Sequence, residues 1–328
     1  MPSCVILSRV HSLQALTTIP RQLGLRLGVA ALGVTGCARK QPPPPPPPPH
    51  AEWQPPLESE IPNDSLGAAI RRGLALLRFT PESLPQYATS SLRCTSCHQQ
   101  DGRKATAAPL IGAQARFPRY LPRSGAVITL ADRVNFCLTR SLAGYAIPHG
   151  SREMEDILAY LAFLSRGLPI GGKAAGGEGL VAMRDTLAAD TARGRSVFNT
   201  SCAVCHRPDG SGAGMIPALW GPRSYSIGAS MARVERAASF ISHNMPQTAP
   251  GSLTPQQAFD VAAFINAQPR PDSPGKQDDW PAGGTPPDVP YATHGHAPFH
   301  PPARLLPRST PGRALVPAPV RINARSQP

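Results

Sequence analysis

Two pentapeptides of the pattern Cys-x-x-Cys-His are the residues of this sequence best suited to chemistry. They read Cys94-Thr-Ser-Cys97-His98 and Cys202-Ala-Val-Cys205-His206. Two thiols on one turn of chain can add to the two vinyl groups of a haem, and the imidazole that follows can bind the iron. A disulfide, a thioredoxin-like motif or a four-cysteine zinc site would not require either histidine. The motifs therefore predict two covalently attached haem c groups, with His98 and His206 as iron ligands.

An internal repeat supplies a second candidate ligand for each iron. The two motifs are 108 positions apart, and the same offset relates Cys137 to Met245, each 39 residues after its motif histidine. A His/Met iron is typical of electron transfer, whereas an anionic thiolate lowers the potential and brings a sulfur nucleophile to the metal. We expect a catalytic His/Cys haem in the first half and an electron-transfer His/Met haem in the second.

Other assignments of these ligands stay open from the residues alone. Cys137 could be an inert buried thiol, since free cysteine is among the most buried residue types. Met231, Met215 and His243 are rivals for the second iron, although Met215 is only nine residues from His206 and the other two break the repeat.

The chain around Cys137 is strongly basic. Residues 110–145 contain five arginines and one acid, namely Arg116, Arg119, Arg123, Arg133 and Arg140 against Asp132. On a helix through Cys137, Arg133 at i−4 and Ser141 at i+4 share the face of the cysteine. Guanidinium groups and a hydroxyl beside a thiolate would suit a small oxyanion. The alternative is that these arginines hold haem propionates or face water.

Helices must position both motifs. Apolar residues at helical spacing predict a helix before each motif and another after it; the four segments are Leu66–Leu77, Ala192–Phe198, residues 157–161 and residues 261–265. This repeated order predicts an all-α protein of two tandem class I-like cytochrome c domains, each binding one covalent haem.

The sequence resembles the thiosulfate dehydrogenase family of dihaem c-type cytochromes from about Trp53 to Tyr291. Besides the haem motifs, the resemblance rests on five segments, which are Trp53-Gln-Pro-Pro, Arg133-Val-Asn-Phe-Cys137-Leu-Thr-Arg140-Ser141-Leu-Ala-Gly144, Pro217-Ala-Leu-Trp220-Gly-Pro222, Asn244-Met245-Pro246 and Asp279-Trp280-Pro281. The segment around Cys137 is the specific one, because generic cytochromes have nothing like it. Some members have lysine before the methionine; here Asn244 stands there, so a lysine ligand switch is not expected.

This resemblance implies oxidation of two thiosulfates to tetrathionate, with electrons passed through the second haem to a soluble or membrane redox partner such as another cytochrome. It implies that Arg123, Arg133 and Ser141 bind substrate, that Cys137 is the distal catalytic ligand and that Met245 is the distal ligand of the second haem. We hypothesise that Cys137 leaves the iron and takes up a sulfane sulfur unit. A tetrathionate reductase and a non-catalytic dihaem electron carrier are the alternatives.

The amino-terminal residues predict export. Residues 1–36 have an arginine-containing start and a short apolar run, which ends in small residues before Cys37. This pattern is typical of a lipoprotein signal peptide, with Cys37 as the lipidated residue, so we expect a periplasmic protein held to the membrane by its lipid anchor only. An ordinary secretory leader is the alternative.

Composition sets the domain boundaries and excludes other classes. The chain has 328 residues, 41 of them proline, and a net charge of +13. The positive charge favours anionic partners, although we expect no nucleic acid partner. The composition excludes collagen, coiled-coil and polytopic membrane proteins. We predict six segments: a signal peptide (1–36), a proline-rich tether (37–56), a first cytochrome c domain (57–167), a glycine-rich linker (168–185), a second cytochrome c domain (186–268) and a largely disordered tail (269–328). We expect the tail to wrap the surface as irregular chain at first and to be disordered beyond about Thr293.

Overall fold

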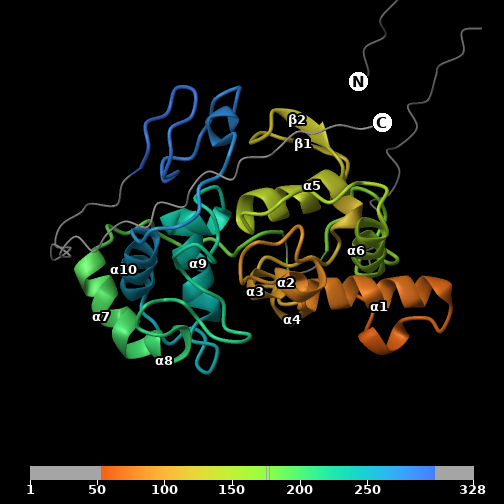
Figure 1. Cartoon of the computed structure of the whole chain (residues 1–328), viewed down its shortest axis with the longest axis horizontal. Coiled ribbons are helices and arrows are strands. Elements are labelled where there is room, and N and C mark those ends of the chain that lie inside the picture. The colour runs from red at the N-terminus through yellow and green to blue at the C-terminus, as the bar shows by residue number, and fades with distance from the viewer. Residues whose placement is uncertain (1–52, 175, 177, 300–328) are drawn as a thin grey trace, which may run out of the picture. The chain divides into compact units, whose positions relative to one another are not determined.

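A computed structural model of the chain describes residues 53–174, 176 and 178–299. The signal peptide, Cys37, most of the tether and the tail from residue 300 lie outside these residues. The described part is mainly helical with few strands (Figure 1), which confirms the all-α prediction. None of its helices is long and apolar enough to cross a membrane.

In the first half, helix α1 (Ser65–Arg78) packs against α6 (Arg152–Phe163). The Asp64 side chain caps α1 by accepting a 2.8 Å hydrogen bond from the Gly67 N–H. Gly73 lies where the helices cross, and a Cβ atom there would be 2.0 Å from the Asp156 carbonyl oxygen. The predicted amphipathic helix is confirmed. Because Gly73 has no side chain, the apolar face of α1 can pack closely against α6.

The second half repeats this arrangement. Helix α7 (Thr191–Ser201) packs against α10 (Pro255–Asn266), and a Cβ on Gly194 would be 2.0 Å from the Asp260 carbonyl oxygen. An arginine beside each glycine binds the aspartate of the facing helix, Arg72 to Asp156 and Arg193 to Asp260. Glycine, arginine and aspartate thus form the same helix junction twice, which supports the repeat read from the sequence.

The remaining helical elements lie before, between, within and after these pairs. They are α2 (Thr80–Ser83), α3 (Cys94–Cys97), α4 (Gln99–Gly102), α5 (Leu130–Phe136), the π-helical turn η3 (Cys137–Ser141), α8 (Ala203–His206), α9 (Val234–Asn244) and the 3-10 turns η1 (Glu58–Glu60), η2 (Gln114–Arg116), η4 (Ser230–Ala232) and η5 (Lys276–Asp278). Buried apolar side chains from both halves form one continuous cluster.

A short β-hairpin before α5 was not predicted. Strands β1 (Arg119–Leu121) and β2 (Ala126–Ile128) pair antiparallel, with Arg119 opposite Ile128. Three-residue strands give too few positions for an alternating pattern to be recognised. The turn of this hairpin carries Arg123 and ends at Gly125, whose φ of 63° suits glycine.

The first part of the predicted disordered tail is placed against the rest of the chain. Residues 269–299 have little regular structure, as their prolines lead one to expect, but Asp279, Trp280, Val289 and Tyr291 are buried. This stretch is therefore irregular chain that packs against the rest of the protein, and most of the residues expected to be disordered, beyond about Thr293, lie outside the described residues. Contacts with residues far away in the sequence stabilise this stretch. Such contacts produce no regular spacing of hydrophobic residues, so the sequence does not reveal them.

Candidate functional site

The first haem motif forms a single helical turn. The Cys94 N–H donates a 3.1 Å hydrogen bond to Thr80 Oγ1, and the His98 N–H donates to the Cys94 carbonyl oxygen at 2.9 Å. His98 Nδ1 is held by the carbonyl oxygen of Ala108. A metal-binding histidine commonly uses its second ring nitrogen in this way, which leaves Nε2 for the metal.

The second motif has the same geometry. The His206 N–H donates to the Cys202 carbonyl oxygen at 2.9 Å, and His206 Nδ1 lies 3.0 Å from the Pro217 carbonyl oxygen. Burial lowers the pKa of His206, which favours the neutral imidazole. A neutral imidazole with a fixed Nδ1 is the form in which histidine binds a metal.

Cys137 lies beside the first motif although 39 residues separate it from His98. A capping box of Thr129 and Asp132 starts α5, and Cys137 begins the π-helical turn after it. Arg133 Nη1 donates a 3.0 Å hydrogen bond to Cys137 Sγ, and the His98 side chain lies close enough to lower the pKa of this thiol. The structure thus brings together three of the predicted site residues, Arg133, Cys137 and His98.

The three thiols near His98 differ in acidity. Burial raises the pKa of Cys94 to about 11 and that of Cys97 to about 12. Burial also disfavours the Cys137 thiolate, but the charge and hydrogen bond of Arg133 and the nearby His98 side chain outweigh it and lower the Cys137 pKa to about 6. Cys137 is therefore the thiol of this group that is ionised at neutral pH, the state required of a nucleophile or metal ligand.

Residues next to the first motif fit a bound haem. Arg93 and Gln99 flank the motif and are both buried, yet Arg93 Nε and Gln99 Nε2 have no hydrogen-bond partner within the described residues. Buried donors are nearly always satisfied, by protein, water or a bound group. Together with the two thiols and the free Nε2 of His98, these donors suit a haem with its anionic propionates.

The other arginines near Cys137 are partly neutralised by acidic side chains. Arg119 forms a 2.5 Å ion pair with Glu178 of the predicted linker, and Arg116 Nε lies 3.8 Å from the same carboxylate. Burial lowers the pKa of Arg116, and the nearby charges of Arg119 and Arg133 lower it further although Glu178 raises it. Arg116, Arg119 and Arg133 therefore form one basic cluster, and Glu178 supplies its counter-charge.

Arg123 and Arg140 share a different counter-ion, which sequence reasoning did not identify as functional. Asp279 binds Arg123 at 2.8 Å and Arg140 at 2.6 Å, and its side chain is fully buried. The Tyr291 hydroxyl donates a 2.7 Å hydrogen bond to the same carboxylate. The Asp279-Trp280-Pro281 segment of the family resemblance was the one signal in the sequence that pointed here.

Ser141 and Met245 are placed by contacts of their backbones. The Ser141 carbonyl oxygen accepts a 3.4 Å hydrogen bond from the Ser226 N–H. Met245 directly follows α9, donates its N–H to the Ile241 carbonyl oxygen at 2.9 Å and packs against the apolar cluster. Their roles in binding substrate and iron stay predictions.

The rivals for the second iron have other surroundings. Met215 is 58% exposed. His243 Nδ1 lies 2.8 Å from the Ser239 carbonyl oxygen on its own helix, and Met231 packs against the apolar cluster. These environments give no reason to prefer any of them to Met245.

Hydrogen bonds connect the loops around the two motifs. Thr106 Oγ1 donates to Asn244 Oδ1 at 2.8 Å, and Asn244 Nδ2 donates to the Thr106 carbonyl oxygen at 3.0 Å. Ser91, just before the first motif, accepts from the Ala218 N–H at 3.1 Å. Each contact joins the neighbourhood of one predicted iron ligand to that of another.

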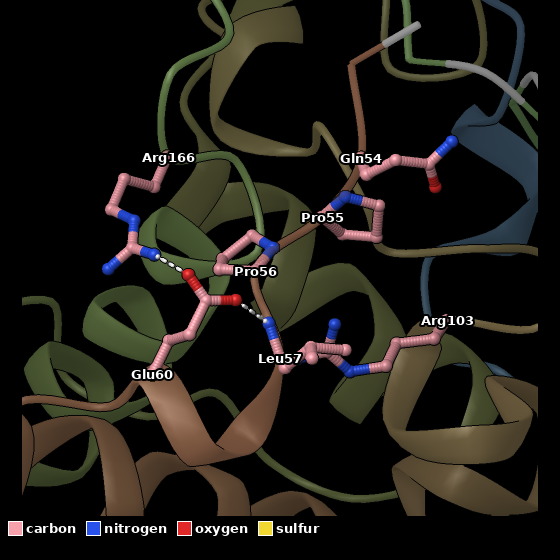
Figure 2. Close-up of a pocket in the computed structure, with 7 residues that line it drawn as sticks. All are labelled: Gln54, Pro55, Pro56, Leu57, Glu60, Arg103 and Arg166. Atoms are coloured by element: carbon pink, nitrogen blue, oxygen red, sulfur yellow. Dashed lines mark hydrogen bonds and ion pairs between the residues drawn. The ribbon is translucent and has the colours of Figure 1, made fainter.

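A surface depression of about 510 Å³ lies apart from these groups. Figure 2 shows Glu60 at its edge, hydrogen-bonded to the Leu57 N–H and ion-paired with Arg166 at 2.6 Å. Its remaining lining residues are Gln54, Pro55, Pro56 and Arg103. None of the predicted site residues lines it, so its size alone does not make it the functional site.

Comparisons with known proteins match both halves. A family model described as the cytochrome c domain of SoxA/TsdA matches residues 86–170, and a cytochrome c model matches residues 191–268. A thiosulfate dehydrogenase of Psychrobacter arcticus is 40% identical over 240 residues, which cover 71% of this chain and 73% of the relative. One of Allochromatium vinosum is 39% identical over 238 residues, which cover 68% and 88%.

A solved structure matches as well. It is a thiosulfate dehydrogenase (TsdBA) from Marichromatium purpuratum, with a TM-score of 0.67 and 31% sequence identity. The match covers 73% of this chain and 55% of that one, so the present chain spans little more than half of its length.

Proposed function

The chain belongs to the thiosulfate dehydrogenase family, and on this premise we propose that it is a dihaem c-type cytochrome that oxidises two thiosulfate ions to tetrathionate. The observation that carries the proposal is the Cys137 thiol, which accepts a 3.0 Å hydrogen bond from Arg133 and has a pKa lowered by Arg133 and His98. A carrier that only passes electrons needs no ionised cysteine beside an arginine.

Arg133 assists the coupling of two anions. Each pair of like unit charges 4 Å apart repels by about 4 kcal/mol at an effective dielectric constant of about 20, and two thiosulfates carry two charges each. A guanidinium at the thiol offsets part of this repulsion and can bind an oxyanion through two parallel N–H groups. The contact to Cys137 occupies one nitrogen of Arg133, which leaves others for the substrate.

Cys137 carries the covalent step that we propose. Its thiolate bonds to the terminal sulfur of one thiosulfate, giving a protein S-thiosulfonate as two electrons leave the sulfur atoms. The terminal sulfur of a second thiosulfate then attacks the adduct sulfur that is bonded to Cys137 Sγ. The bond to Sγ breaks, tetrathionate leaves and the Cys137 thiolate is restored. The two covalent haem c groups, when bound, supply two one-electron acceptors for these electrons.

For the metal sites we propose His98 with Cys137 at the first haem and His206 with Met245 at the second. The fixed Nδ1 atoms of both histidines and the repeat offset of 108 support this assignment. The hydrogen bonds of Thr106 and Ser91 across the two halves support electron transfer between them. From the second haem, electrons pass to a redox partner such as another cytochrome.

Thiosulfate-driven reduction tests the function. Anaerobic addition of thiosulfate to the oxidised protein should bring up the reduced haem absorption bands and yield one tetrathionate for every two thiosulfates. Dithionite serves as the control for intact haems. Reduction by dithionite without any by thiosulfate would leave only an electron carrier, and oxidation of the reduced protein by tetrathionate alone would favour the reverse reaction.

We also propose that the protein is periplasmic and anchored through a lipid on Cys37. The small residues before Cys37 support this, and they lie outside the described residues. Cys37→Ala should move the protein from the membrane fraction to the soluble fraction in a cell that processes lipoproteins. An unchanged membrane fraction would contradict lipid anchoring.

A further inference from the structure

Asp279 is a buried carboxylate with an unusual number of donors. Its Oδ2 accepts from Arg123 Nε at 3.0 Å, Arg123 Nη2 at 2.8 Å and the Tyr291 hydroxyl at 2.7 Å, and its Oδ1 accepts from Arg140 Nη2 at 2.6 Å. Removing one partner from a buried, hydrogen-bonded ion pair is strongly destabilising, because it leaves an uncompensated charge. This carboxylate therefore holds both arginines firmly.

The residues that follow Asp279 contact Arg123 and its hairpin turn. The Trp280 N–H donates a 2.8 Å hydrogen bond to the Arg123 carbonyl oxygen, and the Arg123 guanidinium lies 5.0 Å from the centre of the Trp280 ring. Pro281 packs on the hairpin turn, where a Cβ on Gly125 would be 2.5 Å from its ring. The carboxy-terminal segment thus fixes both the backbone and the side chain of the hairpin arginine.

Arg140 ties the same carboxylate to the turn that carries Cys137. Arg140 and Cys137 belong to one π-helical turn. The Arg140 guanidinium lies 4.3 Å from the centre of the Phe136 ring. The backbone carbonyl oxygen of Arg140 accepts a hydrogen bond from the Ser226 hydroxyl. Asp279 follows the second cytochrome domain in the sequence. It therefore joins two elements of the first domain, the hairpin (residues 119–128) and the π-helical turn (residues 137–141).

We propose that Asp279 is a positioning residue, which orients Arg123 and Arg140 at the Cys137 site and thereby sets the affinity of the first domain for sulfur oxyanions. This inference rests on the proposed function. Asp279 also cancels one of the two positive charges that it holds. The substrate meets two fixed guanidinium groups with a net charge of +1, in place of two mobile groups with a charge of +2.

Asp279→Asn tests the proposal in the full-length protein with both haems attached. Because the arginines bind ground state and transition state alike, we expect the KM for thiosulfate to rise about tenfold with kcat little changed. Binding of tetrathionate to the fully oxidised protein, which cannot turn over, should weaken by a similar factor in calorimetry. Visible spectra of both haems should stay unchanged.

Asp156→Asn is the matched control. Asp156 is a buried carboxylate of the first cytochrome domain and holds Arg72 through two hydrogen bonds of 2.7 Å, but it lies in the junction of α1 and α6. It should lower thermal stability without changing the KM. An equal rise of the KM in both variants would reduce Asp279 to a structural role and overturn the proposal.

Tyr291→Phe tests the positioning role of Asp279 if the Asp279→Asn variant does not fold. It removes one of the four hydrogen bonds to the carboxylate and keeps the ring, so we expect the KM to rise about threefold. In whichever variant folds, a KM within experimental error of the original, or a lower one, would overturn the positioning role. Failure of the unsubstituted protein to bind tetrathionate or accept electrons from thiosulfate would instead defeat the proposed function.

Discussion

Thr106 and Asn244 exchange hydrogen bonds between the two cytochrome domains, hydroxyl to amide oxygen at 2.8 Å and amide nitrogen to carbonyl oxygen at 3.0 Å. Asn244 is fully buried and also donates to the Phe240 carbonyl oxygen at 2.9 Å. It directly precedes Met245, and Thr106 lies two residues before the carbonyl group that holds His98. This pair is therefore a direct link between the surroundings of the two predicted haem ligands.

Asn244→Ala should loosen this link. The loss of the amide leaves buried partners unsatisfied, so we expect the free energy of unfolding to fall by about 1–3 kcal/mol and electron transfer to the second haem to slow severalfold. Denaturant unfolding and stopped-flow absorption after mixing with thiosulfate measure the two effects. Asn135→Ala is the control, because Asn135 makes a similar buried pair with Ile147 inside the first half. Equal transfer rates in both variants would contradict the link.

Cys137→Gly should abolish thiosulfate oxidation and leave two haems attached. The reason is that Cys137 carries the sulfur nucleophile in the proposed mechanism, whereas attachment depends on the thiols of the two motifs. Haem content measured as the pyridine haemochrome, with tetrathionate formation as the assay, separates these effects. Cys137→Met keeps a sulfur atom that can bind iron but cannot form the thiosulfonate, so it should also be inactive. Activity in either variant would defeat the covalent role.

Gly73→Ala should destabilise the first domain. The added Cβ would meet the Asp156 carbonyl oxygen at 2.0 Å, so α1 and α6 must separate, and overpacking of this kind costs about 1–3 kcal/mol. Gly150→Ala, where nothing lies within 4 Å of the added atom, is the matched control and should be neutral. Chemical denaturation followed by circular dichroism compares them. Equal stability of the two variants would show that the helices adjust without strain.

Acid should weaken the second domain through the cap of α7. Hydrogen bonds from the Arg193 and Ala192 N–H groups lower the pKa of Asp190 below its usual 3.8. A carboxyl group with a lowered pKa stabilises the fold above its unfolded pKa, near pH 4, and this stabilisation is lost as the pH falls through the folded pKa. Asp190→Asn keeps a capping oxygen without titrating. Its melting temperature should fall less than that of the original between pH 5 and pH 2.5, and equal falls would exclude the contribution of Asp190.

The parts of the site that local patterns specify could be predicted from the sequence. The haem motifs, their flanking helices and the i−4 relation of Arg133 to Cys137 each depend on residues close together in the chain. The Arg133 contact at 3.0 Å confirms the last of these. Burial of α1 on one face follows from helical spacing in the same way, whereas residues 258–265 of α10 are all buried.

The Asp279 contacts could not be predicted in this way. Asp279 is 156 residues from Arg123 and 139 from Arg140, and the proline-rich chain around it has no hydrophobic period. The sequence therefore suggested surface chain there, and the resemblance assigned Arg123 to substrate without its counter-ion. The hairpin that presents Arg123 was missed for a related reason, because its strands are too short to show alternation.

Because of the position of Asp279 in the sequence, the first cytochrome domain depends on residues outside it for two of its ion pairs. The first cytochrome domain is synthesised first, yet two of its arginines find their counter-charge only in a residue made after the second domain is complete. Haem attachment to Cys94 and Cys97 needs no part of that later stretch. A newly made chain can thus carry its first haem before the proposed substrate site is in order, and a gene fragment ending at residue 268 would encode two cytochromes without the residue that holds Arg123 and Arg140.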